Sequence, residues 1–129
     1  MGGIFVKISE QLEKEKKIKQ ETNRIKKIYK NLGRDKIKFL GGLIHETAFM
    51  KISLEDLRNT LTKDGMTELF EQGDQSFIRE RPEVKIYTTF IQRYQNGMKI
   101  LIDLMPGPLK KEENDKLMDF VNKGKALKK

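Results

Sequence analysis

The feature that most constrains the fold of this chain is a regular apolar stripe between two prolines, Pro82 and Pro106. Proline is tolerated in the first turn of a helix and ends a helix elsewhere, so this pair bounds a predicted helix of about 24 residues. Inside it, apolar residues recur at steps of 4, 3, 4, 3 and 4, namely Tyr87, Ile91, Tyr94, Met98, Leu101 and Met105. Such a pattern predicts a packing seam, which forms either the central core or, in addition, a contact between subunits.

A second long helix is predicted near the start of the chain. Residues 8–32 hold no proline or glycine and are dominated by Lys, Glu, Gln and Arg, and Gly33 follows as a cap. The apolar residues of this helix form only a thin seam, namely Ile18, Ile25, Tyr29 and Leu32. It cannot build a core alone, so it either packs as an arm on the rest of the fold or pairs with another copy.

Two shorter helices are predicted between these long ones. Residues 35–50 carry an apolar stripe, although Gly41 and Gly42 weaken this prediction unless another backbone packs closely there. Ser53 has the hydroxyl of an N-cap and opens a leucine-rich helix that ends before Gly65. Two helices with a short break between them could be a relative of the helix-turn-helix motif, although recognition residues are not evident.

The remaining segments are less regular. Residues 66–80 hold two short apolar runs around a turn-rich spacer and predict a short β-hairpin, with an irregular loop as the alternative. Beyond Pro106 the chain is rich in Lys and Glu, and ends in a short amphipathic patch made of Leu117, Met118, Phe120 and Val121. This patch either docks on a partner or packs as a last helix on its own domain.

These elements predict a mainly α fold with long N-terminal and central helices. The predicted organisation is a basic N-terminal helix or arm over residues 1–33, a helical core with an assembly helix over residues 34–106, and a flexible C-terminal tail with its docking patch over residues 107–129.

Positive charge is concentrated in the N-terminal third of the chain. Residues 1–38 hold 12 Lys and Arg against five acidic residues, whereas residues 39–129 hold 15 against 14. A concentrated positive field attracts polyanions, because neutralising phosphates releases condensed counterions. The cations predicted to bind nucleic acid are Lys14, Lys16, Lys17, Lys19, Arg24, Lys26, Lys27, Lys30, Arg34, Lys36 and Lys38. The alternative is a solvated helix with a lysine-rich face.

Residues for catalysis are sparse. The chain has no cysteine, its one histidine is His45, and no glycine loop has the spacing that cradles phosphates. We therefore expect a protein that is not an enzyme and that needs no metal or cofactor. The lack of cysteine and of a long apolar run predicts a cytoplasmic protein without a membrane span.

Several local patterns carry a family resemblance. They are LIHETAFM (residues 43–50), SLEDL (53–57), RPEVKIY (81–87) leading to Tyr94, LIDLMP (101–106) and MDFV (118–121). In order and local sequence they resemble small terminase subunits of phages and prophages of Gram-positive bacteria. The resemblance covers residues 25–122, and neither the Gly41-Gly42 pair nor the strongly basic first helix matches a family feature.

The resemblance implies a role in genome packaging in the cytoplasm of a bacterial host. Small terminase subunits form rings that bind the packaging start site on double-stranded viral DNA and deliver it to the terminase large subunit, which carries the ATPase and the nuclease. Two other classes stay open. A phage-encoded DNA-binding regulator predicts a dimer on palindromic sites, and a head-tail adaptor predicts assembly without DNA affinity.

Overall fold

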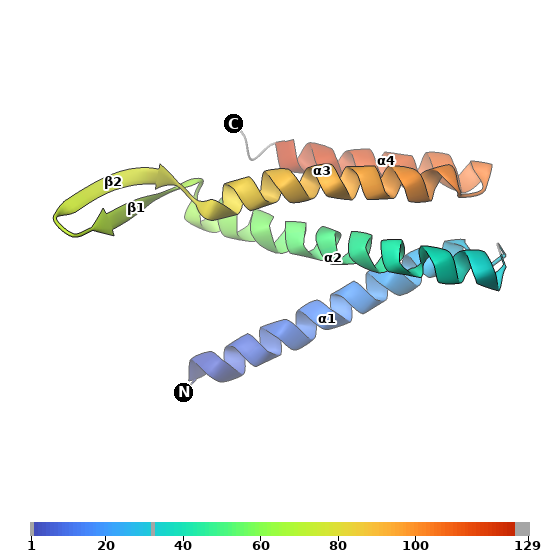
Figure 1. Ribbon diagram of the computed structural model, residues 1–129, viewed down its shortest axis with the longest axis horizontal. Coiled ribbons are helices and arrows are strands. Elements are labelled where there is room, and N and C mark those ends of the chain that lie inside the picture. The colour runs from blue at the N-terminus through green and yellow to red at the C-terminus, as the bar shows by residue number, and fades with distance from the viewer. Residues whose placement is uncertain (1, 32, 126–129) are drawn as a thin grey trace.

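The computed structural model describes the backbone of residues 2–31 and 33–125 and the side chains of residues 7–31 and 33–124, and it confirms a mainly α fold with a short hairpin. The elements in chain order are α1 (Gly2–Ile28), α2 (Arg34–Asp64), β1 (Thr67–Gln72), β2 (Gln75–Glu80), α3 (Pro82–Asp103) and α4 (Gly107–Lys125). Helices α2 and α3 lie side by side, α1 packs on α2, and α4 packs on α3 (Figure 1). The hairpin projects beyond the helices at the end where α2 leads into α3.

The core is built from one stripe of each helix. Ile25 of α1 and Tyr29, in the turn after it, are buried in this core, and the Tyr29 hydroxyl donates a hydrogen bond to the carbonyl of Leu101. The predicted seam of α3 lies in this core: Tyr87, Tyr94, Met98, Leu101 and Met105 are buried, and Ile91 is partly buried against them. The seam therefore packs within the chain itself.

Helices α2 and α3 approach each other closely at a glycine. A Cβ on Gly97 would lie 2.5 Å from the Cγ2 atom of Thr47, which is far inside van der Waals contact. The Thr47 hydroxyl turns back to its own helix and donates to the carbonyl of Ile44 at 2.9 Å. Only the Thr47 methyl therefore faces α3, and it occupies the space that the missing side chain leaves.

The prediction of two short helices over residues 35–64 is wrong, because α2 is continuous from Arg34 to Asp64. Ser53 lies buried in mid-helix, and its hydroxyl is without a hydrogen-bond partner among the described residues. The segment around it holds neither glycine nor proline, and the burial of Ile52 and Leu54 favours continuing the helix through it. A helix-turn-helix relative needs a turn here, and none is present in residues 34–64.

The boundaries of α1 also differ from the prediction. The helix already includes Gly2 and ends at Ile28, and a turn of residues 29–31 follows it. Gly33, predicted as a C-cap, instead precedes α2 with φ +90°, which glycine adopts without strain. Leu32, the last residue of the predicted seam, lies outside the described residues.

The hairpin is present as predicted. Strands β1 and β2 pair antiparallel from Thr67↔Glu80 to Gln72↔Gln75, and Gly73 has the positive φ of a tight turn.

The C-terminal segment differs from the predicted flexible tail, because residues 107–125 form α4. Leu117 and Val121 are buried against the core and Phe120 is partly buried, so these members of the predicted docking patch pack on their own domain. Only Met118 of the patch is well exposed. Residues 126–129 of the predicted tail lie outside the described residues.

Candidate nucleic-acid interface

A stripe of lysines follows the exposed side of α1. Lys16, Lys19, Asn23, Lys26 and Lys30 recur at steps of 3, 4, 3 and 4, with Lys27 beside them, and all six are exposed. We call these six residues the lysine stripe. The members of the repeat from Lys19 to Lys30 each follow by one position a residue that is partly or fully buried, namely Ile18, Thr22, Ile25 and Tyr29. Successive residues of a helix are about 100° apart, so the lysine stripe is turned about 100° away from the core.

The lysines of this stripe keep their charge available. None of the five forms an ion pair with a described residue. Along the helix axis the stripe extends over about 20 Å, at 1.5 Å per residue. The stripe is thus a row of solvated ammonium groups along α1 that ends in the turn after this helix.

Two of the predicted nucleic-acid-binding cations have other roles. Lys14 Nζ lies 3.9 Å from a carboxylate oxygen of Asp56 on α2 and 5.3 Å from the centre of the Phe49 ring. Arg24 makes ion pairs of 2.6 Å with Glu21 and 2.8 Å with Glu113. These two side chains hold α1 on the body of the protein, so we place them outside the candidate interface.

The Arg24 cluster ties three helices together. Glu113 of α4 is only 3% exposed and binds Arg24 of α1. Lys51 of α2 lies 3.2 Å from Glu21 of α1. Burial alone would raise the pKa of Glu21, but the hydrogen bond from Arg24 and the charges of Lys51 and Arg24 outweigh it and lower that pKa. The lowered pKa favours the ionised form of Glu21, and the ion pairs of the cluster fix α1 against α2 and α4.

Two tyrosines beside this cluster are held in their neutral form. Burial first, and then the charge of Glu113, raise the pKa of Tyr29 to about 12. Burial and the nearby charge of Glu21 also raise the pKa of Tyr94. Arg24 itself has a raised pKa, because its bonds to Glu21 and Glu113 outweigh the opposing effect of burial. None of these groups titrates near neutral pH, so the cluster is a structural anchor.

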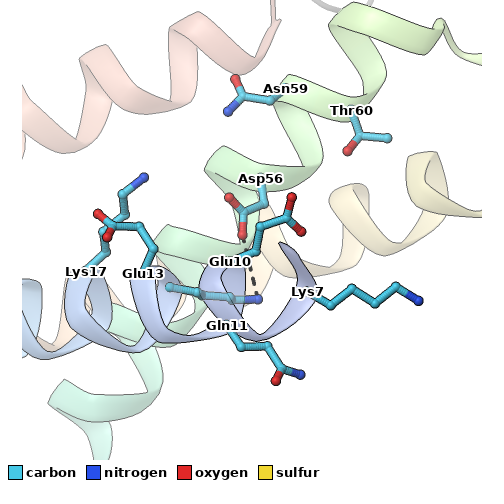
Figure 2. A pocket seen from close by; sticks show the side chains of 9 residues that line it. Lys7, Glu10, Gln11, Glu13, Lys17, Asp56, Asn59 and Thr60 are labelled. Atoms are coloured by element: carbon cyan, nitrogen blue, oxygen red, sulfur yellow. Dashed lines mark ion pairs between the residues drawn. The ribbon is translucent and has the colours of Figure 1, made fainter. Parts of the chain in front are cut away.

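The acidic residues of α1 lie mainly on another side of the helix. Glu10 and Glu13 line a polar hollow of about 590 Å³ between α1 and α2, into which Asp56 also faces (Figure 2). Glu21 is turned to the cluster described above. Glu15 is exposed and lies four residues before Lys19, on the same face of the helix as the lysine stripe. Glu10, Glu13 and Glu21 are thus turned to other parts of the protein, and Glu15 is the acidic residue of α1 that stays beside the lysine stripe.

The remaining predicted cations extend or flank this surface. Lys26, Lys27 and Lys30 line a shallow hollow with Asn23 and with Ile37 of α2. Three of the predicted cations lie on α2, where they are exposed on its first turns: Arg34, Lys36 and Lys38. Lys17 is exposed on the flank of α1 beside the polar hollow (Figure 2).

Asn23 was missed by the sequence analysis, which considered only cations. An amide both donates and accepts hydrogen bonds, so it can contact a phosphate oxygen or a base edge. The signal that would have identified it is the 3-4-3-4 repeat of exposed residues along α1, in which it occupies the central position.

Other kinds of site find little support in the described part of the chain. His45 is exposed on α2. Among the residues that the structure describes, no group of three His, Asp or Glu side chains is arranged to hold a metal ion. Within residues 2–31 and 33–125, no helix has the length and apolar character needed to cross a membrane.

Comparisons with protein-family models, with curated proteins and with solved structures find no match for this chain. The candidate interface is therefore argued from its own residues.

Proposed function

We propose that this chain is an oligomeric DNA-binding protein that contacts duplex DNA through α1. Its particular role would be that of a small terminase subunit, which recognises viral DNA and delivers it to the large ATPase and nuclease subunit in the cytoplasm of a bacterial host. The observation that carries the DNA-binding part is the lysine stripe, whose charges have no ion-pair partner among the described residues, while Arg24 and Lys14 anchor the same helix on its other side. The packaging role rests on the sequence resemblance.

Duplex DNA fits this surface better than a small anion does. The lysines form a row about 20 Å long and not a converging cluster, so they match the regular charge of a polymer. An α-helix of 10–12 Å diameter also fits the major groove, which is about 12 Å wide. Cations of this kind contact the phosphate backbone, which positions a protein without reading sequence. Asn23 is the member of the stripe that can add a base contact.

The two alternatives keep different amounts of support. A regulator of helix-turn-helix type is weakened, because α2 runs without a break through the segment that would hold the turn. An adaptor that assembles without DNA keeps one argument in its favour, namely the large apolar side chains that the protein leaves exposed, such as Phe39 and Ile78. The regulator is expected to be a dimer, which has a lower mass than the proposed assembly. The adaptor is expected to assemble without affinity for DNA.

The test is the mass of the purified protein in light scattering, at low and moderate salt, with and without duplex DNA. The proposal predicts an assembly larger than a dimer whose mass increases when DNA is added. A dimer that binds DNA would support a regulator instead. An assembly indifferent to DNA at both salt concentrations would support the adaptor, and a monomer indifferent to DNA would overturn the proposal as a whole.

A further inference from the structure

An apolar groove lies where the start of α2 meets the end of α3. It has a volume of about 680 Å³ and is lined by Phe39, Leu40 and Leu43 of α2 and by Ile100 and Leu104 of α3, with Asp35, Lys36 and Asp103 at its edges. Phe39 is 88% exposed, and Ile100 and Leu104 are about half exposed. Side chains of this size on a surface usually mark a contact with another molecule.

A matching apolar knob lies at the opposite end of the molecule. Leu69 of β1 and Ile78 of β2 are direct partners across the hairpin, so both side chains stand on the same face. They are 62% and 74% exposed. Directly opposed residues have Cβ atoms about 5 Å apart, so the two side chains form one compact apolar projection.

The knob cannot reach the groove of its own chain. Phe39 and the end of α2 at Asp64 are separated by 25 helical residues, which is about 37 Å at 1.5 Å per residue. The hairpin then extends away from the helices and not back along them (Figure 1). The groove can therefore receive a hairpin only from another molecule.

The charges around the two features are complementary. The hairpin, residues 67–80, holds four acidic residues against one arginine. The charged residues that line the groove itself are Asp35, Asp103 and Lys36. Arg34, Lys38 and Lys99 flank them, so the segments 34–38 and 99–104 together hold four basic residues against two acidic ones. Two copies of the groove end repel each other, as do two hairpins, whereas a hairpin and a groove attract. Charge thus favours a second copy of this chain in a head-to-tail arrangement.

We propose that the Leu69-Ile78 knob of one copy docks in the Phe39-Ile100 groove of the next copy. A contact between two different surfaces of the same chain is heterologous, so it repeats from copy to copy and gives either a closed ring or an open filament. This inference deepens the self-association included in the proposed function. It makes no use of the lysine stripe, and its test reads mass and not DNA binding, so either proposal can fail alone.

The experiment compares three double variants in analytical ultracentrifugation. The knob variant is Leu69→Glu with Ile78→Glu, and the groove variant is Phe39→Glu with Ile100→Glu. The matched control is Ile8→Glu with Met118→Glu, which places two charges at half-exposed apolar positions outside both surfaces. All six positions are exposed, so folding is expected to persist and is checked by circular dichroism. The knob and groove variants are expected to raise the concentration needed for assembly by about tenfold or more, and the control is expected to assemble like the wild type.

Mixing the two defective variants tests the head-to-tail arrangement itself. The groove variant keeps an intact knob and the knob variant keeps an intact groove, so an equimolar mixture is expected to form a one-to-one dimer that cannot grow further. A mixture that stays monomeric would overturn the proposal, since an intact knob and an intact groove would then have failed to bind each other. The proposal would equally be overturned by a wild type that is monomeric at every concentration, or by variants that assemble as the wild type does.

Discussion

Replacing Lys16, Lys19, Lys26 and Lys30 by alanine is expected to lower the affinity for duplex DNA about a thousandfold at 0.15 M salt. Lys16, Lys19 and Lys26 lie in one row on α1, and Lys30 continues the row in the turn after it. All four are exposed and have no ion-pair partner among the described residues. Their loss therefore removes phosphate contacts without breaking a contact that the structure records. Alanine also has the highest helix propensity, so α1 is expected to keep its conformation.

The magnitude follows from counterion release. Each neutralised phosphate contributes about 0.9 to the slope of log affinity against log salt concentration. Relative to 1 M salt, one contact is then worth about fivefold in affinity at 0.15 M salt, and four contacts are worth about a thousandfold. The slope itself is expected to become shallower by about 3 to 4.

The assay is fluorescence anisotropy of a labelled duplex titrated with protein at several salt concentrations. The control variant replaces Lys63, Lys85, Lys110 and Lys111 by alanine, which are exposed lysines outside α1, and so removes the same net charge. The control is expected to keep most of the affinity and nearly the whole slope. Equal losses in the two variants would refute the assignment of the contact to α1, because overall charge alone would then explain the binding.

The remaining predictions concern stability and are checked by urea denaturation. Gly97→Ala is expected to lower the free energy of unfolding by about 1–3 kcal/mol, because the new methyl group overpacks against Thr47. The control is Gly42→Ala, whose methyl group meets no atom within 4 Å and is expected to raise the free energy of unfolding by about 0.5–1 kcal/mol. Similar effects at the two glycines would contradict the close contact between α2 and α3. The pKa of Glu21 is lowered from 4.5 in the folded state, so the stability that its ion pairs contribute is fully present above pH 4.5 and is lost as the pH falls through the lower folded pKa. Arg24→Ala is expected to reduce this acid sensitivity, and an unchanged pH profile would argue against the cluster as an anchor.

The central helix and the hairpin could be predicted because local signals determine them. Pro82 is the first residue of α3 and Pro106 lies just beyond its end, and the apolar repeat between them is unbroken. The hairpin has a glycine turn between two short apolar runs. In both segments the residue propensities, the apolar pattern and the turn residues favour the same secondary structure, and tertiary packing favours it too.

The continuity of α2 could not be predicted in the same way. Ser53 has the local features of an N-cap, followed by acidic residues in what would be the first turn. Burial of Ile52 and Leu54 on either side of it favours a helix that continues, and this contribution depends on neighbours that are distant in sequence. Tertiary packing therefore overrode the capping signal, and left the Ser53 hydroxyl buried without a partner among the described residues.

The candidate site was predicted only in part, for a related reason. Net charge located the basic region, but it could not separate free cations from paired ones. Arg24 is paired with Glu113, which lies 89 positions further along the chain, and no local pattern indicates this contact. The periodicity of the exposed residues was the usable signal, since it sets the row of lysines apart from the buried stripe beginning at Ile18.

The most direct test of the central claim is the salt dependence of the affinity of the wild-type protein for a random-sequence duplex. With four to six phosphate contacts from the lysine stripe and its flanks, the slope of log affinity against log salt concentration is predicted to lie between about −3.5 and −5.5. Absence of binding at low salt, or an affinity that does not change with salt, would contradict the claim that α1 binds DNA through its lysines.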